Sequence, residues 1–286
     1  MLSIRRDFFA RVAISLILAV ALFGIGACST TETLNTAIYS HPVPDKFAAI
    51  VIDTKTGKTL YSASATEPRY PASLTKMMTL YLLFVALDSG RINKQTPIPV
   101  SATAASKPAS KLYLKAGSTI PVELAIRALV VKSANDVATA VAEFLADGSE
   151  DRFAEIMTQQ AQALGMTSTR FKNASGLHDS GQVTTATDMA RLSLALKNRF
   201  PHHYHYFSLR SFDYNGKTIR GHNKAMDMIA GADGIKTGYT RASGFNLTTS
   251  VRKNGKSLVG VVMGETTSKV RDQRMTQLLA YHLRRN

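Results

Sequence analysis

Ser73-Leu74-Thr75-Lys76 is the stretch that best indicates the fold of this chain, because two further motifs follow it in a characteristic order. The second motif is Ser133-Ala134-Asn135, and the third is Lys236-Thr237-Gly238. Each motif by itself is short enough to occur by chance. Together, in this order and with these separations, they predict a nucleophilic serine, a lysine partner and a strand that binds a carboxylate.

The first motif lies at the expected start of a helix. Apolar residues recur at helical spacing between Leu74 and Leu87, so the helix should begin near Ser73. A helix N-terminus offers unpaired N–H groups where negative charge develops on a carbonyl oxygen under attack. Lys76 shares a helix face with Ser73, and burial would lower the pKa of its amine enough to accept a proton. Taken alone, the pattern more often marks an N-cap serine followed by a solvated lysine.

The second motif lies between two segments with helical apolar periodicity, residues 122–131 and 137–145. A turn between helices is therefore expected, and such a turn can project side chains into a cleft. The Ser133 hydroxyl would relay a proton, and the Asn135 amide would hold the backbone of a substrate. Both residues are also good N-caps for the following helix, which is the structural alternative.

The third motif follows the turn residues Asp233-Gly234 and precedes Tyr239, so an extended edge strand is expected. Gly238 removes side-chain bulk, which would let an extended peptide pair with this edge. Lys236 and Thr237 would supply hydrogen-bond donors to a carboxylate. The alternative is an ordinary β-turn that carries a basic residue.

Two predicted hairpins frame a largely helical middle region. Residues 47–64 should turn at Thr56-Gly57, and residues 245–264 at Asn254-Gly255. Helices are expected near residues 74–88, 121–132, 136–147, 150–164, 186–198 and 271–283. Strands from both termini around a helical insert predict an α+β fold with one antiparallel sheet, covered by helices on one face, beside an all-α lobe. The three motifs would then meet at a cleft between the sheet and the lobe.

From about Phe47 to the C-terminus, the chain resembles the low-molecular-mass penicillin-binding proteins of the serine-type D-alanyl-D-alanine carboxypeptidase family. The resemblance is strongest over residues 71–79 and 233–238, and it extends to residues 114–117 and 163–166. It implies a fold similar to that of β-lactamases and transpeptidases, and it implies no cofactor.

By this resemblance, Ser73 would be the acylated nucleophile and Lys76 its general base. Ser133 and Asn135 would relay the proton and orient the substrate. The activity implied is removal of the last D-alanine from peptidoglycan stem peptides, with β-lactams as inhibitors.

The resemblance also implies how the substrate is held. Lys236, Thr237 and Gly238 would form the carboxylate-binding strand, and the N–H groups of Ser73 and Tyr239 would form the oxyanion hole. An arginine at the distance of Arg271 after the third motif binds the terminal carboxylate in the family, and a guanidinium suits that group well. The alternative for Arg271 is a surface arginine at the start of the last helix.

Two positions depart from better-known members of the family. Tyr239 stands where they carry histidine, and His222 stands before Asn223 where they carry arginine. Both positions lie near the expected cleft. They leave the acyl-transfer chemistry intact and place the preference for the substrate stem in doubt.

Several other functions fit some of these features. A DD-endopeptidase that cuts cross-links shares all three motifs, and Arg271 favours a free carboxylate instead. A class A β-lactamase needs a deacylating glutamate, but no glutamate lies between Glu155 and Glu265. A non-catalytic wall-binding lipoprotein would have lost Ser73 or Lys76, and neither is missing. No metal is expected, because the seven histidines lack ligand spacing and His202, His203 and His205 form a surface cluster.

The N-terminus predicts export. Three arginines precede an apolar run from Val12 to Gly26, a pattern that is typical of a secretory signal over residues 1–27. Ile25-Gly26-Ala27-Cys28 resembles a lipoprotein cleavage box, and Cys28 is the only cysteine. Lipid on Cys28 would attach the protein to a membrane. Cleavage after a small residue without lipidation is the alternative.

These features predict a protein of the periplasm or cell envelope with three parts. The signal would be followed by a tether over residues 28–45 and by the DD-peptidase domain over residues 46–286. Loss of the leader, with three arginines and one aspartate, would lower the net charge from +15 to +13. Such a basic protein suits an anionic cell wall, although a solvated surface without a partner is also consistent. Nucleic acid is not an expected partner, because the basic residues are dispersed and no nucleic-acid motif occurs.

Overall fold

The computed structural model describes residues 41–284, within which residues from Val43 onward belong to one compact unit. The predicted signal, Cys28 and nearly all of the tether lie outside the described residues. No helix in residues 41–284 combines the length and apolar character that a membrane crossing needs.

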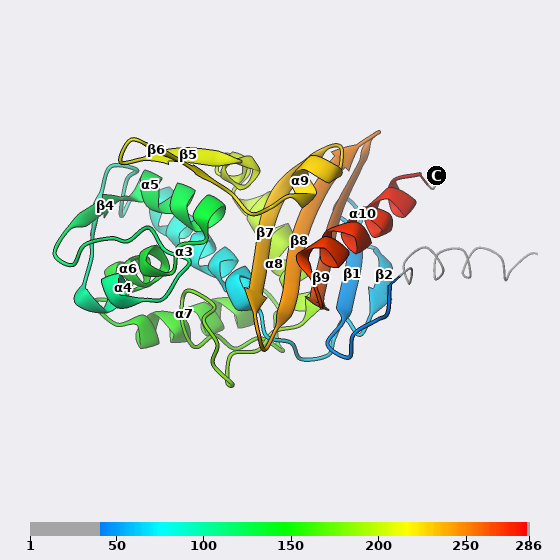
Figure 1. Ribbon diagram of the computed structural model, residues 1–286, viewed down its shortest axis with the longest axis horizontal. Helices are drawn as coiled ribbons and strands as arrows, with labels where there is room; N and C mark the ends of the chain where they lie inside the picture. The colour runs from blue at the N-terminus through cyan, green and yellow to red at the C-terminus, as the bar shows by residue number, and fades with distance from the viewer. Residues whose placement is uncertain (1–40, 285–286) are drawn as a thin grey trace, which may run out of the picture. The chain divides into compact units, whose positions relative to one another are not determined.

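A five-stranded antiparallel sheet joins the two ends of the compact unit (Figure 1). Its strand order is β2-β1-β9-β8-β7. The strands are β1 (Ala48–Asp53), β2 (Thr59–Ala63), β7 (Ala232–Thr240), β8 (Gly244–Lys253) and β9 (Lys256–Glu265). Both predicted hairpins are confirmed, and β1 pairs with β9 so that Ile50 lies opposite Val261. Strand β7, which carries the third motif, forms one edge of the sheet as predicted.

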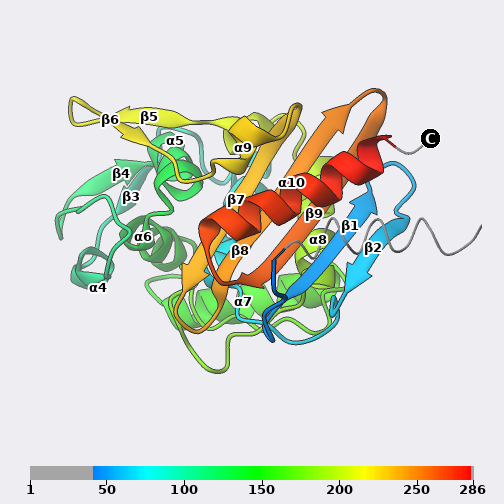
Figure 2. The same ribbon diagram turned by 45° about the vertical axis from the view of Figure 1, so that its right-hand side comes forward.

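Helices cover both faces of the sheet, so the prediction of cover on one face was wrong (Figure 2). Helix α10 (Ser268–Arg284) lies so close to one face that a Cβ on Gly260 would be 2.6 Å from the sulfur of Met275. Val259 and Val261 belong to the core that α8 (Ala186–Arg199) completes on the other face. Both faces need cover because every residue of β9 after the first is buried, on either side of the sheet.

The all-α lobe is confirmed. Its central helix, α3 (Lys76–Asp88), is buried over nearly its whole length. Around it lie α4 (Ala102–Ser106), α5 (Val122–Arg127), the π-helical turn η2 (Ala128–Lys132), α6 (Asn135–Leu145) and α7 (Glu150–Ala163). The helix predicted over 121–132 is thus α5 followed by η2.

Several short elements were not predicted from the sequence. They are helix α4 of the lobe, the 3₁₀ turns η1 (Ala72–Thr75) and η3 (Tyr204–Ser208), helix α9 (Ala225–Met228), and the small hairpins β3 (Pro97–Pro99) with β4 (Thr119–Pro121) and β5 (Ser211–Tyr214) with β6 (Lys217–Arg220). Segments of three to five residues are too short to show a periodic apolar pattern. Of these elements, η1 matters most for the site, because it carries Ser73.

Candidate active site

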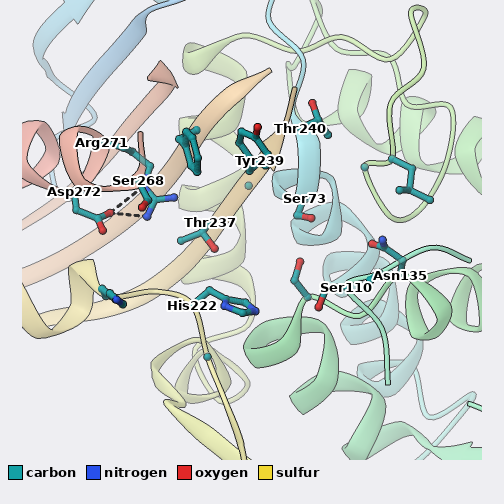
Figure 3. Close-up of a pocket in the computed structure, with 18 residues that line it drawn as sticks. Ser73, Ser110, Asn135, His222, Thr237, Tyr239, Thr240, Ser268, Arg271 and Asp272 are labelled. Atoms are coloured by element: carbon teal, nitrogen blue, oxygen red, sulfur yellow. Dashed lines mark hydrogen bonds and ion pairs between the residues drawn. The ribbon is translucent and has the colours of Figure 1, made fainter. Parts of the chain in front are cut away.

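The three motifs meet at one cavity of about 520 Å³ between β7 and the all-α lobe (Figure 3). Seven of the nine predicted active-site residues line it: Ser73, Ser133, Asn135, Thr237, Gly238, Tyr239 and Arg271. The other two, Lys76 and Lys236, are buried behind its wall. The predicted convergence of sheet edge, helix start and inter-helix turn is therefore confirmed.

Ser73 lies in η1, immediately before α3 begins at Lys76. The helix predicted to begin near Ser73 is therefore a 3₁₀ turn over Ala72–Thr75 that continues into α3. The backbone here is shaped by close packing: Ala72 has a φ of 49°, and a Cβ on Gly176 would lie 1.9 Å from the Ala72 carbonyl oxygen. Only glycine fits at position 176. This contact fixes the backbone that presents the Ser73 hydroxyl to the cavity.

The amine of Lys76 is completely buried and touches three groups. Its Nζ lies 3.3 Å from Ser73 Oγ, donates to Asn135 Oδ1 at 2.7 Å and donates to the carbonyl oxygen of Ser175. Burial, and then the nearby Lys236 cation, lower the pKa of Lys76 well below its usual range, while two carboxylates of the lobe oppose this. The alternative of a solvated helix lysine is therefore contradicted.

The second motif points toward the two buried lysines. Ser133 ends η2 with a left-handed φ of 59°, and its Oγ accepts a hydrogen bond from Lys236 Nζ at 2.9 Å. Asn135 is held from its other side, because its Nδ2 donates to the Pro108 carbonyl at 2.9 Å. Helix α6 has no side-chain cap, so the alternative that these residues cap it is contradicted.

The third motif brings a second buried amine to the cavity wall. Burial, with a smaller effect of the Arg271 guanidinium, lowers the pKa of Lys236 to about 7. Its Nζ also donates to the Thr237 carbonyl at 3.0 Å. A Cβ on Gly238 would lie 3.1 Å from both the Pro71 oxygen and the Ser73 nitrogen. Glycine at position 238 therefore lets β7 approach the Ser73 amide closely.

Arg271 reaches the cavity from the first turn of α10, and it is only 4% exposed. The alternative of a surface arginine is therefore contradicted. Its Nε and Nη2 donate to Asp272 Oδ1 at 2.9 and 2.7 Å, whereas Nη1 makes only a 3.4 Å contact with the Asn246 carbonyl. Asp272 also lines the cavity, and burial raises the pKa of its carboxyl. The Nε and Nη2 side of the guanidinium is thus held by Asp272, whereas Nη1 is only weakly bonded.

Sequence reasoning missed Asn246, which joins the sheet to the nucleophile segment. Its Nδ2 donates to the carbonyls of Tyr70 and Pro71 at 3.0 and 3.1 Å, and its Oδ1 accepts from the Gly264 amide. In the sheet it lies directly opposite Gly238. Strand β8 also carries Thr248, Thr249 and Ser250, so one more polar residue in it gave no signal from which this role could be predicted.

Several other residues at the cavity were not assigned roles from the sequence, Ser110 and Lys224 among them. Ser110 and Lys224 line it from the lobe and from the segment before α9. His222, noted above as a departure from the family, also lines the cavity. Tyr239, the other departure, is 55% exposed and stacks on Phe245 with ring centroids 4.2 Å apart. The two departures therefore both lie at the cavity, as expected.

Comparison with known proteins agrees with this geometry. Residues 37–267 match a family model described as D-alanyl-D-alanine carboxypeptidase. The chain is 34% identical to D-alanyl-D-alanine carboxypeptidase DacA of Escherichia coli K12, over 97% of this chain and 71% of that protein.

Solved structures show the same fold. The crystal structure of penicillin binding protein 6B from Escherichia coli is 34% identical, covers 86% of this chain and 80% of its own, and has a TM-score of 0.78. The crystal structure of the D-alanyl-D-alanine carboxypeptidase DacD from Francisella tularensis is 29% identical and has a TM-score of 0.80. The match covers 85% of this chain and 71% of that one. Penicillin-binding protein D2 from Listeria monocytogenes, in its cefotaxime-bound form, is 28% identical and has a TM-score of 0.76. The match covers 85% of this chain and 100% of that one. This chain belongs to the D-alanyl-D-alanine carboxypeptidase family of serine-type peptidases.

Proposed function

We propose that the protein removes the terminal D-alanine from peptidoglycan stem pentapeptides through an acyl-enzyme on Ser73. The observation that carries this proposal is the fully buried Lys76 amine, 3.3 Å from a serine hydroxyl that opens onto the cavity. A buried amine of lowered pKa is a base for a neighbouring hydroxyl, so no histidine is needed. The retained serine and lysine argue against a purely wall-binding role.

The hydrogen bonds of Lys76 suit the neutral form of its amine. A neutral amine has two N–H groups and one lone pair. The two N–H groups would donate to the Asn135 and Ser175 oxygens, and the lone pair would accept the Ser73 proton. As that proton moves to Nζ, Oγ forms a bond to the carbonyl carbon of the penultimate D-alanine. The carbonyl oxygen becomes an oxyanion.

The amides of Ser73 and Tyr239 would stabilise this oxyanion. Support for the pair comes from Gly238, whose lack of a side chain allows β7 to approach the Ser73 nitrogen. Collapse of the intermediate breaks the C–N bond and protonates the leaving nitrogen. The proton would pass from Lys76 through the Ser133 hydroxyl, which Lys236 holds in place. Free D-alanine leaves, and water then hydrolyses the ester to restore Ser73.

Recognition of a free C-terminal carboxylate would involve the basic wall of the cavity. Arg271 and Thr237 line this wall, and the buried amine of Lys236 lies behind it, where it donates a hydrogen bond to the Thr237 carbonyl. The weakly bonded Nη1 of Arg271 is the group that would donate to the carboxylate. A β-lactam would place its own carboxylate on the same wall and acylate Ser73. The relative from Listeria monocytogenes, solved in a cefotaxime-bound form, supports this inference.

We also propose that the protein is exported to the cell envelope and held at a membrane by lipid on Cys28. The support is the sequence alone, since the signal over residues 1–27 and the cleavage box lie outside the described residues. Residues 28–45 would then be the tether of a peptidase domain over residues 46–286.

Replacing Ser73 with alanine should abolish D-alanine release from a muramyl pentapeptide. Loss of the nucleophile is expected to lower kcat by about 10⁴-fold or more. The matched control is Ser268→Ala, which removes another hydroxyl that lines the cavity. Comparable release by the Ser73 variant and the unaltered protein would contradict the proposed mechanism.

The kcat/KM for D-alanine release should have a bell-shaped dependence on pH. On the acid side it rises as Lys76 loses its proton and becomes a base. On the alkaline side it falls near pH 7, because Lys236, with a pKa of about 7, loses the charge that binds the carboxylate. On each side of the maximum, kcat/KM should change by roughly tenfold per pH unit. In Lys236→Arg the guanidinium stays charged, so an unchanged alkaline limb in this variant would contradict the assignment.

Replacing Arg271 with alanine should impair peptides with a free C-terminal carboxylate more than the corresponding amides. Loss of a charge-assisted hydrogen bond is expected to lower kcat/KM for the acid by about 10- to 100-fold. Arg241→Ala removes an exposed arginine and serves as the control. If kcat/KM falls equally for the peptide acid and its amide, Arg271 has a structural role instead. That result would favour cross-link endopeptidase activity.

Lipid attachment can be tested by metabolic labelling with palmitate. The unaltered protein should be labelled and found with membranes, whereas Cys28→Ala should be unlabelled, with no effect on D-alanine release. Equal labelling of both proteins, or labelling of neither, would contradict lipid on Cys28.

A further inference from the structure

A cluster of one carboxylate and two imidazoles lies apart from the cavity. Asp88 is the last residue of α3, and His202 and His203 lie in the turn between α8 and η3. The Nε2 atoms of the two histidines lie 2.8 and 2.9 Å from the same carboxylate oxygen, Asp88 Oδ1. None of the three lines the cavity. At 1.5 Å per residue, α3 separates Asp88 from Lys76 by roughly 18 Å.

We propose that Asp88, His202 and His203 form a binding site for a divalent first-row transition-metal ion, with zinc as the best match. One ligand atom from each residue lies within 4.8 Å of the other two. Two imidazole nitrogens and one carboxylate oxygen are a ligand set that zinc accepts, and imidazole favours such metals over magnesium or calcium. The proposal replaces the sequence expectation that these histidines bind no metal.

The spacing of the ligand atoms is close to what a metal needs. Zinc–nitrogen and zinc–oxygen distances of about 2.0–2.2 Å place neighbouring tetrahedral ligands about 3.3 Å apart. The nitrogen–oxygen distances of 2.8 and 2.9 Å must therefore widen by about half an ångström. Small rotations of the side chains supply this change. Each imidazole would then bind as the neutral tautomer with its proton on Nδ1, and the metal would replace both hydrogen bonds.

The surroundings hold one ligand firmly and leave the metal open to solvent. His203 is buried and stacks on Phe84, with ring centroids 4.8 Å apart and planes at 22°. The His202 side chain is 55% exposed, so water can complete the coordination. In the described part of the chain, Asp88 Oδ2 has no hydrogen-bond partner and is available as a second oxygen ligand.

Metal at this site would join the C-terminal end of α3 to the turn after α8. Helix α3 begins with Lys76, whereas the metal would bind twelve residues later at its other end. Because the ligands come from distant parts of the sequence, the ion would bind only the folded chain and would raise its melting temperature. The site is separate from Ser73, so D-alanine release should be independent of the metal.

The test is calorimetric titration of zinc chloride into the full chain, purified in detergent without a histidine tag. The unaltered protein should bind one zinc ion per chain, and zinc should raise its melting temperature. Asp88→Asn, which keeps the side-chain shape, and His202→Gln should each weaken zinc binding by at least tenfold. His205→Gln is the matched control, because His205 is an exposed histidine of the same region outside the cluster.

Two results would overturn the proposal. One is that the unaltered protein binds no zinc. The other is that Asp88→Asn and His202→Gln bind zinc as tightly as His205→Gln does. Unchanged D-alanine release by all three variants, without added metal, would show that they are folded. The proposal does not depend on the reaction at Ser73, so either can fail while the other stands.

Discussion

The buried amine of Lys76 is the constraint on which the rest of the active site depends. An amine removed from water holds a proton poorly, and a second buried cation at Lys236 strengthens this effect. The hydrogen-bond acceptors around Nζ, from Asn135 and Ser175, fix its position beside the Ser73 hydroxyl. In the proposed mechanism, this burial lets Lys76 act as a base. The fold must bring several distant segments together to maintain that burial.

Close backbone approaches bring those segments together. Gly176 allows one loop to pack directly on the backbone before Ser73, and Gly238 allows β7 to approach the same segment closely. Asn246, opposite Gly238 in the sheet, bonds to the carbonyls of the same segment. Backbone packing against this loop and against the sheet therefore positions Ser73, and no histidine takes part in these contacts.

The sequence predicts what local patterns determine, which here includes both hairpins, the main helices and seven lining residues of the cavity. It does not predict contacts that depend on packing between distant segments. Asn246 has no motif, and the cover on the second face of the sheet depends on how α8 folds back. Asp88 and His202 are 114 residues apart, so their proximity is visible only in the folded chain. The roles of Cys28 and the leader are predictions from sequence alone.

The most direct measurement is mass spectrometry of the protein after brief incubation with benzylpenicillin, followed by peptide mapping of the adduct. If Lys76 activates Ser73, one penicilloyl group should be attached per chain, on the peptide that contains Ser73. Repeating the measurement with Lys76→Ala should give little adduct in the same time. An adduct on another residue, or full labelling of Ser73 without the Lys76 amine, would contradict the account.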